Sequence, residues 1–301
     1  MNITALLDCL GSTQCVITQA TSAVVIAMLL FLTASGLSLI FGVLGIGNFA
    51  HGSFYMLGAY FTYAVTTGLG GYYSLALILA PLGVGFIGFL AERFLVRRIY
   101  SAPHTSQFLL TFGIMLVLDD AVRFIWGFDY RSIPMPTFFQ RPPLRFLGSA
   151  IPAYYGFIIL IGILVALGLW TVLSKTKFGK VVNAAASDAD MLECLGVDVR
   201  SVYTLVFALG TMMAGLGGLL AAPMRSAMPG MGLSILLESF CIMVIGGVGS
   251  MGGVLAAAFM VGIMRSFGIL GFPDFELFFV FFLVIVVLIF RPWGISGQPM
   301  E

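Results

Sequence analysis

The stretch Phe41-Gly-Val-Leu-Gly-Ile-Gly-Asn-Phe-Ala-His-Gly52 places a glycine-rich, polar sequence in the middle of a long uncharged segment. Residues 9–91 contain no Asp, Glu, Lys or Arg. Because one crossing of a bilayer needs about 20 mostly apolar residues, this segment alone holds enough chain for roughly three crossings. The sequence therefore predicts a membrane protein with a polar element inside its apolar spans.

The composition of the whole chain agrees with this prediction. Hydrophobic residues make up 60% of the 301 positions and charged residues 9%, with a mean hydropathy of +1.09. Soluble proteins carry about 25% charged residues. The apolar runs are long and continuous, which indicates helices, because barrel strands alternate over roughly ten residues. The net charge of +1 gives no indication of a nucleic acid partner.

We predict an all-α polytopic membrane protein with about eight to nine membrane segments, some of them discontinuous at glycine-rich breaks. The chain is expected to be one transmembrane domain over residues 1–301. Hydropathy places the segments near residues 18–44, 49–67, 74–96, 106–126, 153–174, 201–222, 235–247, 252–270 and 275–290.

The positive charges predict the orientation in the membrane. The three lysines of the chain, Lys175, Lys177 and Lys180, lie within six residues of one another. Short cytoplasmic loops carry an excess of Lys and Arg, so the segment 175–200 is expected in the cytoplasm. If each predicted segment crosses the membrane once, the amino terminus and the proline-rich loop 127–153 lie on the extracytoplasmic side and the carboxyl terminus lies in the cytoplasm.

The cysteines predict no metal site, because their spacing fits none of the usual ligand patterns. Cys194 and Cys241 are interpreted as single small hydrophobic residues. Cys9 and Cys15 flank a short Gly-Ser-Thr-Gln segment, and a disulfide between them would form only if that segment faces an oxidising compartment. The sequence leaves both states open.

The segment 175–200 has the pattern of two short helices. Apolar or small residues recur at helical spacing from Phe178 to Leu195, Ser187-Asp-Ala-Asp190 has the form of a capping box, and Gly196 suits a helix stop. An apolar stripe outside the membrane needs a surface to bury against, so we expect it to insert into a partner. The alternative is a solvated connector between two spans.

Two glycine-rich breaks interrupt the apolar runs. Gly45-Ile-Gly-Asn-Phe and Gly247-Val-Gly-Ser-Met align as one element used twice. In transporters, interrupted helices at corresponding positions expose backbone groups where they line a cavity. The alternative is that the glycines only allow close helix packing. If the breaks line the substrate pathway, the residues predicted to contribute to it are Gly45, Gly47, Asn48, Phe49, His51, Ser53, Gly247, Gly249 and Ser250.

Four motifs in order resemble the permease subunits of branched-chain amino-acid ABC importers. They are Phe41 to Tyr60, Lys177 to Val197, Ile245 to Gly253, and the ending Arg291-Pro-Trp-Gly-Ile. The resemblance implies a bacterial inner (plasma) membrane importer with a second permease subunit, two cytoplasmic ATP-binding subunits and an extracytoplasmic solute-binding protein. It also implies that 175–200 engages the ATPases, through Phe178, Gly179, Val182, Ala185, Ser187, Asp188, Ala189, Leu192 and Gly196.

The chain itself is expected to be neither an enzyme nor a nucleotide-binding protein. It contains no Gly-x-x-x-x-Gly-Lys-Ser/Thr phosphate loop, so ATP must be bound by partner subunits and no cofactor is expected in this chain. Branched-chain or other hydrophobic amino acids are the expected solutes, with urea, short amides or small carboxylates as alternatives. A second alternative is a proton-coupled carrier that uses Asp119, Asp120, Glu238 and His51.

Overall fold

A computed structural model describes residues 3–68, 72–140, 143–146 and 148–297. The elements in chain order are α1 (Ile3–Gly11), α2 (Thr13–Leu44), α3 (His51–Gly68), α4 (Tyr73–Phe94), η1 (Val96–Ile99), α5 (His104–Trp126), η2 (Thr137–Phe139), β1 (Leu144–Phe146), β2 (Ser149–Ile151), α6 (Ala153–Lys175), α7 (Lys177–Ser187), α8 (Ala189–Cys194), α9 (Val199–Ala221), α10 (Gly232–Gly246), α11 (Met251–Gly271), η3 (Pro273–Phe275) and α12 (Glu276–Phe290).

Helices account for nearly all of this structure, and each predicted membrane segment coincides with a helix. Within the described residues, five helical stretches are long and apolar enough to cross a membrane. They are Thr13–Leu44, Tyr73–Ile99, Ala153–Lys175, Val199–Ala221 and Met251–Gly271. The 15-residue α10 is shorter than the about 20 residues of a full crossing. The prediction of an all-α polytopic membrane protein is therefore confirmed.

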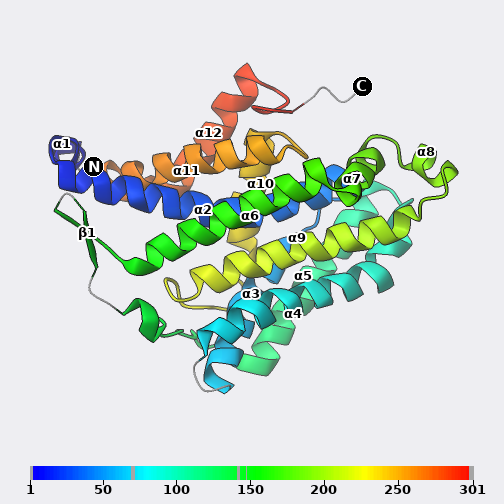
Figure 1. The fold of residues 1–301 in the computed structure, drawn as a ribbon, viewed down its shortest axis with the longest axis horizontal. Coiled ribbons are helices and arrows are strands. Elements are labelled where there is room, and N and C mark those ends of the chain that lie inside the picture. The colour runs from blue at the N-terminus through cyan, green and yellow to red at the C-terminus, as the bar shows by residue number, and fades with distance from the viewer. Residues whose placement is uncertain (1–2, 69–71, 141–142, 147, 298–301) are drawn as a thin grey trace.

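Helix α2 lies at the centre of the bundle. It is buried along most of its length and packs against α6, α9, α10 and α11. Figure 1 shows α2, α6, α9 and α11 running along the long axis of the molecule, with α10 crossing them. Two buried hydroxyls of α2 are satisfied within the helix, since Thr33 and Ser35 donate to the carbonyls of Leu30 and Leu32. This makes α2 the scaffold on which the other elements are placed.

Close glycine contacts set how the helices pack. A Cβ atom added at Gly58 of α3 would collide with the backbone of Gly215 in α9, and one added at Gly88 of α4 would collide with Thr211. Small residues let helix backbones approach closely in membranes, where no hydrophobic effect drives helices together. Gly58 and Gly88 therefore allow close packing of α3 and α4 against α9.

The bundle has two distinct ends. At one, which we call the hairpin end, strands β1 and β2 pair antiparallel and the hydroxyl of Ser149 donates to the carbonyl of Gln14 at 2.8 Å. Cys9 and Cys15 form a disulfide there, which resolves the alternative left open by the sequence. The other, the α8 end, carries α7, α8 and the segment 291–297, which pairs with the end of α10 (Figure 1).

Candidate functional site

The first glycine-rich break carries the chain from the end of α2 back into the bundle. Helix α2 stops at Gly45, whose φ of 68° is left-handed. Asn48 Oδ1 accepts from the backbone N–H of Ala50 at 3.1 Å and shapes the turn into α3. The carbonyl of Gly47 accepts from Thr111 Oγ1 at 3.1 Å. The break is therefore an ordered, buried backbone segment held by side chains.

The first residues of α3 bind to the middle of other helices. His51 Nε2 lies 2.8 Å from the carbonyl oxygen of Thr33, so Nε2 carries the proton and Nδ1 is left without a hydrogen-bond partner among the described residues. Ser53 Oγ donates to Asp119 Oδ1 at 2.9 Å. Arg123 forms an ion pair with the neighbouring Asp120 at 3.2 Å. The ring of Phe49 packs edge-on against Phe108.

The starts of α3 and α10 meet inside the protein. A Cβ atom added at Gly52 would collide with the carbonyl of Gly232, and one added at Gly232 would meet the backbone of Gly52 and Ser53. Two helix amino termini thus lie against each other next to the middle of α2. Helix starts carry partial positive charge and unsatisfied N–H groups, which is the arrangement that interrupted transporter helices use near their solutes.

The second break is a turn at the α8 end. Gly247 and Gly249 have φ of 96° and 75°, and Ser250 caps α11 by accepting from the backbone N–H of Gly253 at 3.2 Å. The N–H of Gly249 donates to Ser38 Oγ of α2 at 3.1 Å. The final segment covers the turn, since the N–H of Ile295 donates to the carbonyl of Ile245 at 2.8 Å. The similar sequences of the two breaks therefore have different surroundings.

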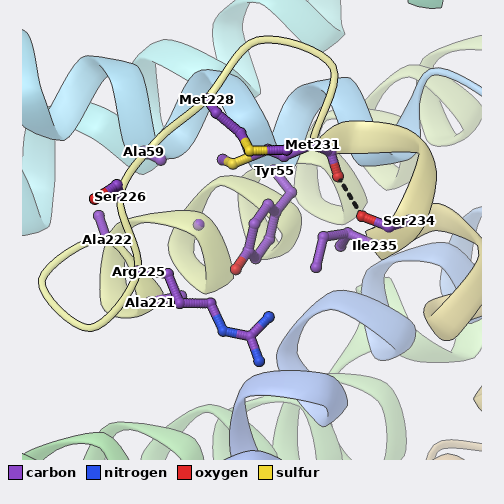
Figure 2. Close-up of a pocket in the computed structure, with 11 residues that line it drawn as sticks. Tyr55, Ala59, Ala221, Ala222, Arg225, Ser226, Met228, Met231, Ser234 and Ile235 are labelled. Atoms are coloured by element: carbon purple, nitrogen blue, oxygen red, sulfur yellow. Dashed lines mark hydrogen bonds between the residues drawn. The ribbon is translucent and has the colours of Figure 1, made fainter. Parts of the chain in front are cut away.

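A cavity of about 260 Å³ lies beside the start of α10, between α3, α9 and the loop 222–231. Its lining is shown in Figure 2 and comprises Tyr55, Ala59, Gly218, Ala221, Ala222, Arg225, Ser226, Met228, Met231, Ser234 and Ile235. The loop that carries Arg225 pairs with the loop after α5 through the backbones of Ala227 and Arg131. None of the pathway residues selected from the sequence lines this cavity.

A smaller cavity of about 40 Å³ shares Tyr55, Ala221, Arg225 and Ile235 with the first. Its wall contains Glu238 of α10 and Arg265 of α11, which form a buried ion pair at 3.1 Å. Glu238, which the alternative of a proton-coupled carrier would use, is therefore paired within this chain in the wall of the cavity.

The sequence reasoning missed Tyr55 and Arg225. Tyr55 lies in the motif Phe41 to Tyr60 but is not among the predicted pathway residues. Arg225 lies outside the predicted membrane segments. Its position four residues after the end of an apolar helix, and 13 residues before Glu238, was the available signal.

The segment 177–194 folds into two short helices, as predicted, but its apolar stripe is not available to a partner. Val182, Ala185 and Leu192 are buried within this chain, where they cluster with Leu39, Val43, Val199, Val202 and Val206 of α2 and α9. The prediction that this stripe inserts into a partner is therefore wrong, because the stripe finds its apolar surface in the bundle itself.

The cap positions of this segment differ by one residue from the predicted capping box. Asp188, not Ser187, caps α8, and its side chain accepts from the N–H of Met191 at 2.9 Å. Gly196 follows α8 with a left-handed φ of 82°, as the helix stop requires. Gly179 and Phe178 face the end of α6 and the cluster, while Ser187 is exposed and Ala189 is half-buried. Met191 and Leu195 are the exposed apolar residues of α8 and its end.

The α9 start is also stabilised by a cap. Asp198 accepts from the backbone N–H and the hydroxyl of Ser201, and these hydrogen bonds lower the pKa of its carboxyl. The carboxylate therefore stays ionised at neutral pH, where it suits a helix amino terminus.

Comparison with known proteins gives a consistent result. Residues 19–288 match the family described as the permease component of the branched-chain amino acid transport system. The chain is 29% identical to the high-affinity branched-chain amino acid transport system permease protein BraD of Pseudomonas aeruginosa over 280 residues, which cover 89% of this chain and 91% of BraD. No solved structure matches it.

Two permease proteins of Escherichia coli K12 are also similar to this chain. LivH is 26% identical over 282 residues, which cover 89% of this chain and 91% of LivH. LivM is 26% identical over 296 residues, which cover 90% of this chain and 68% of LivM. Both are named as permease proteins of a high-affinity branched-chain amino acid transport system.

Proposed function

This chain belongs to the permease family of the branched-chain amino acid transport system, and from that membership we propose that it moves branched-chain or other hydrophobic amino acids across the inner (plasma) membrane. The match over residues 19–288 supports this proposal, since it runs from α2 into α12 and includes both breaks, the cavity and α7–α8. The protein is a multi-pass membrane subunit and not an enzyme.

In this proposal, the chain contacts a second permease, ATP-binding subunits, a solute-binding protein and membrane lipid. A second permease packs beside this one, and the naming of both LivH and LivM in one organism supports a pair of different but related chains. Two separate subunits bind and hydrolyse ATP, since this chain lacks a phosphate loop. A solute-binding protein delivers the amino acid at the hairpin end, and lipid surrounds the rest.

We place the ATPases at the α8 end. The lysines at and after the end of α6 put this end in the cytoplasm by the positive-inside rule. Because the inner stripe of α7 and α8 is buried in the bundle, the contact falls to the outer surface, where Met191 is 61% and Leu195 74% exposed. An exposed apolar pair on a short helix outside the membrane suits a groove on a partner protein.

The solute route, in this proposal, passes the two interrupted segments. It starts at the cavity, continues beside the meeting helix starts of α3 and α10, and reaches the α8 end near Gly249 and Ser250. Gly45, Gly47, Asn48, Phe49, His51 and Ser53 form the wall contributed by the first break. Asn48 and Thr111 hold the backbone of this break in place through hydrogen bonds. These bonds support a preformed wall that does not have to unfold for the solute to pass.

The test of this function is solute-stimulated ATP hydrolysis by the reconstituted complex with its own binding protein. Leucine, isoleucine and valine are expected to stimulate hydrolysis, whereas urea, acetamide and acetate are not. Stimulation by urea or acetamide alone would assign the importer to small amides and overturn the amino-acid proposal. The orientation is tested in the same vesicles with single cysteines at Lys177 and Gln140, which should react with an impermeant reagent from opposite sides.

A further inference from the structure

We propose that the cavity lined by Tyr55, Arg225 and Met231 is the site at which this permease holds a zwitterionic amino acid, with the solute carboxylate on Arg225 and its apolar side chain against the methionines. This inference deepens the proposed function and rests on it for the identity of the solute. The similarity to known permeases assigns no role to these residues.

The first observation is a positive charge at the wall of the cavity. Arg225 is an exposed residue that lines both the larger and the smaller cavity; its backbone N–H donates to the carbonyl of Ala221, and within the described residues its side chain makes no hydrogen bond or ion pair. Figure 2 shows its guanidinium group pointing into the space that the Tyr55 hydroxyl also faces. A guanidinium group presents paired donors that match a carboxylate, and hydrogen bonds between such charged groups are stronger than neutral ones.

The second observation is the charge balance of the whole site. Glu238 and Arg265 neutralise each other at 3.1 Å, so Arg225 leaves the combined cavity with one excess positive charge. This charge attracts the carboxylate end of a solute. Glu238 lines only the smaller cavity and its carboxylate is already paired with Arg265, so Arg225 is the charged group left for the solute carboxylate.

The third observation is the apolar remainder of the lining. Met228, Met231 and Ile235 face the same cavity, with Ala221 and Ala222 beside them. Methionine side chains are flexible and fill irregular spaces, so they can accept leucine, isoleucine and valine side chains of different shape. At about 260 Å³, the cavity is smaller than the roughly 300–1,000 Å³ of pockets for drug-sized ligands. Its size thus favours a single amino acid over a peptide.

Charge-selective thiol modification tests this site directly. The full importer in lipid nanodiscs would carry Ser234→Cys, with Cys194→Ser and Cys241→Ala and with the Cys9–Cys15 disulfide kept. A negatively charged methanethiosulfonate should react faster than a positively charged one. Arg225→Gln should slow the negative reagent and speed the positive one by up to about fivefold each, as expected for one unit charge at about 4 Å in water, so the ratio of the two rates should fall by up to about 25-fold. The matched control Arg145→Gln, on the hairpin, should leave it unchanged.

The second measurement is whether a bound solute protects the cysteine at position 234 from modification. L-leucine should slow the modification of Cys at position 234 more than leucinamide does, and Arg225→Gln should remove this difference. If L-leucine gives no protection in the parent protein, or if the difference survives in Arg225→Gln, the proposed site is wrong. Leucine-stimulated ATP hydrolysis is measured on the same samples. Its absence would contradict the proposed function, whereas normal stimulation without protection would contradict only the site.

Discussion

Between Leu44 and His51 the chain leaves α2 at the α8 end and runs back alongside α2. Helix α3 therefore begins next to the carbonyl of Thr33, in the middle of α2. Between Gly246 and Met251 the chain only turns, under the final segment, and starts α11 at the same end. The two breaks have similar sequences, yet one supplies a helix start in the interior and the other a cap at the periphery.

The difference shows that glycine serves two separate purposes here. At Gly52 and Gly232 the side chain must be absent because two backbones touch. At Gly45 and Gly249 the backbone is left-handed, and the space for a Cβ atom is open or ordinary. Sequence alignment of the breaks detects the glycines but cannot separate these purposes, because close approach depends on a distant part of the chain.

The largest effect is expected at the α8 end, where α7 packs against α2 and α9 near the second break. Ala185 is 4% exposed in an apolar cluster. Ala185→Asp places an unpaired charge there, which should cost about 3–5 kcal/mol, as for uncompensated buried charges. The measurement is thermal unfolding and yield of the purified complex. The neighbouring Ala184 is exposed, so Ala184→Asp should have little effect; equal losses for both variants would show that α7 is not buried against the bundle.

The next effect tests the close approach at the first break. Gly52→Ala brings a Cβ atom into the backbone of Gly232, which cannot yield as a flexible side chain would. Overpacking of this kind should destabilise the protein by about 1–3 kcal/mol. Gly252→Ala, in the first turn of α11 just after the second break, is the matched control, because a Cβ atom there meets nothing within 4 Å. An unchanged unfolding midpoint for Gly52→Ala would show that the close approach to Gly232 does not require glycine at position 52.

The left-handed glycines should show a smaller effect that is equal in the two breaks. Gly45 and Gly249 have φ of 68° and 75°. Replacement by Ala should cost about 1–2 kcal/mol, since the left-handed region is unfavourable for residues with a Cβ atom, whereas Asn, which tolerates this region, should cost less. Unfolding curves of Gly249→Ala and Gly249→Asn give the answer. If Asn is no better than Ala, the left-handed backbone is not the reason for glycine there.

The smallest effect concerns two side chains that accept backbone hydrogen bonds, one in each break. Asn48 and Ser250 accept from the backbone N–H groups of Ala50 and Gly253. Asn48→Ala and Ser250→Ala should each cost about 1 kcal/mol, the typical value for a lost hydrogen bond or helix cap. Asn48→Ser and Ser250→Thr keep an uncharged acceptor and should restore most of the stability. Loss without such rescue would assign these residues a role other than accepting these hydrogen bonds.

Much of the fold could be predicted from the sequence, because hydropathy and helical periodicity are local signals. The helices around Gly58 and Gly88 and the two short helices after Lys177 are examples. The face on which α7 and α8 bury Val182 and Leu192 could not be predicted, since periodicity shows that a stripe is buried but not what covers it. The cavity was missed for the same reason, because Arg225 reaches Tyr55 and Glu238 only through the path of the loop 222–231.

The central claim is that this chain is the membrane subunit of an ATP-driven importer, and the most direct test is uptake of radiolabelled L-leucine into proteoliposomes that contain the complete complex. With the binding protein on the hairpin side and ATP on the α8 side, leucine should accumulate, and a proton gradient without ATP should give none. Accumulation driven by the proton gradient alone would contradict this account and support a proton-coupled carrier.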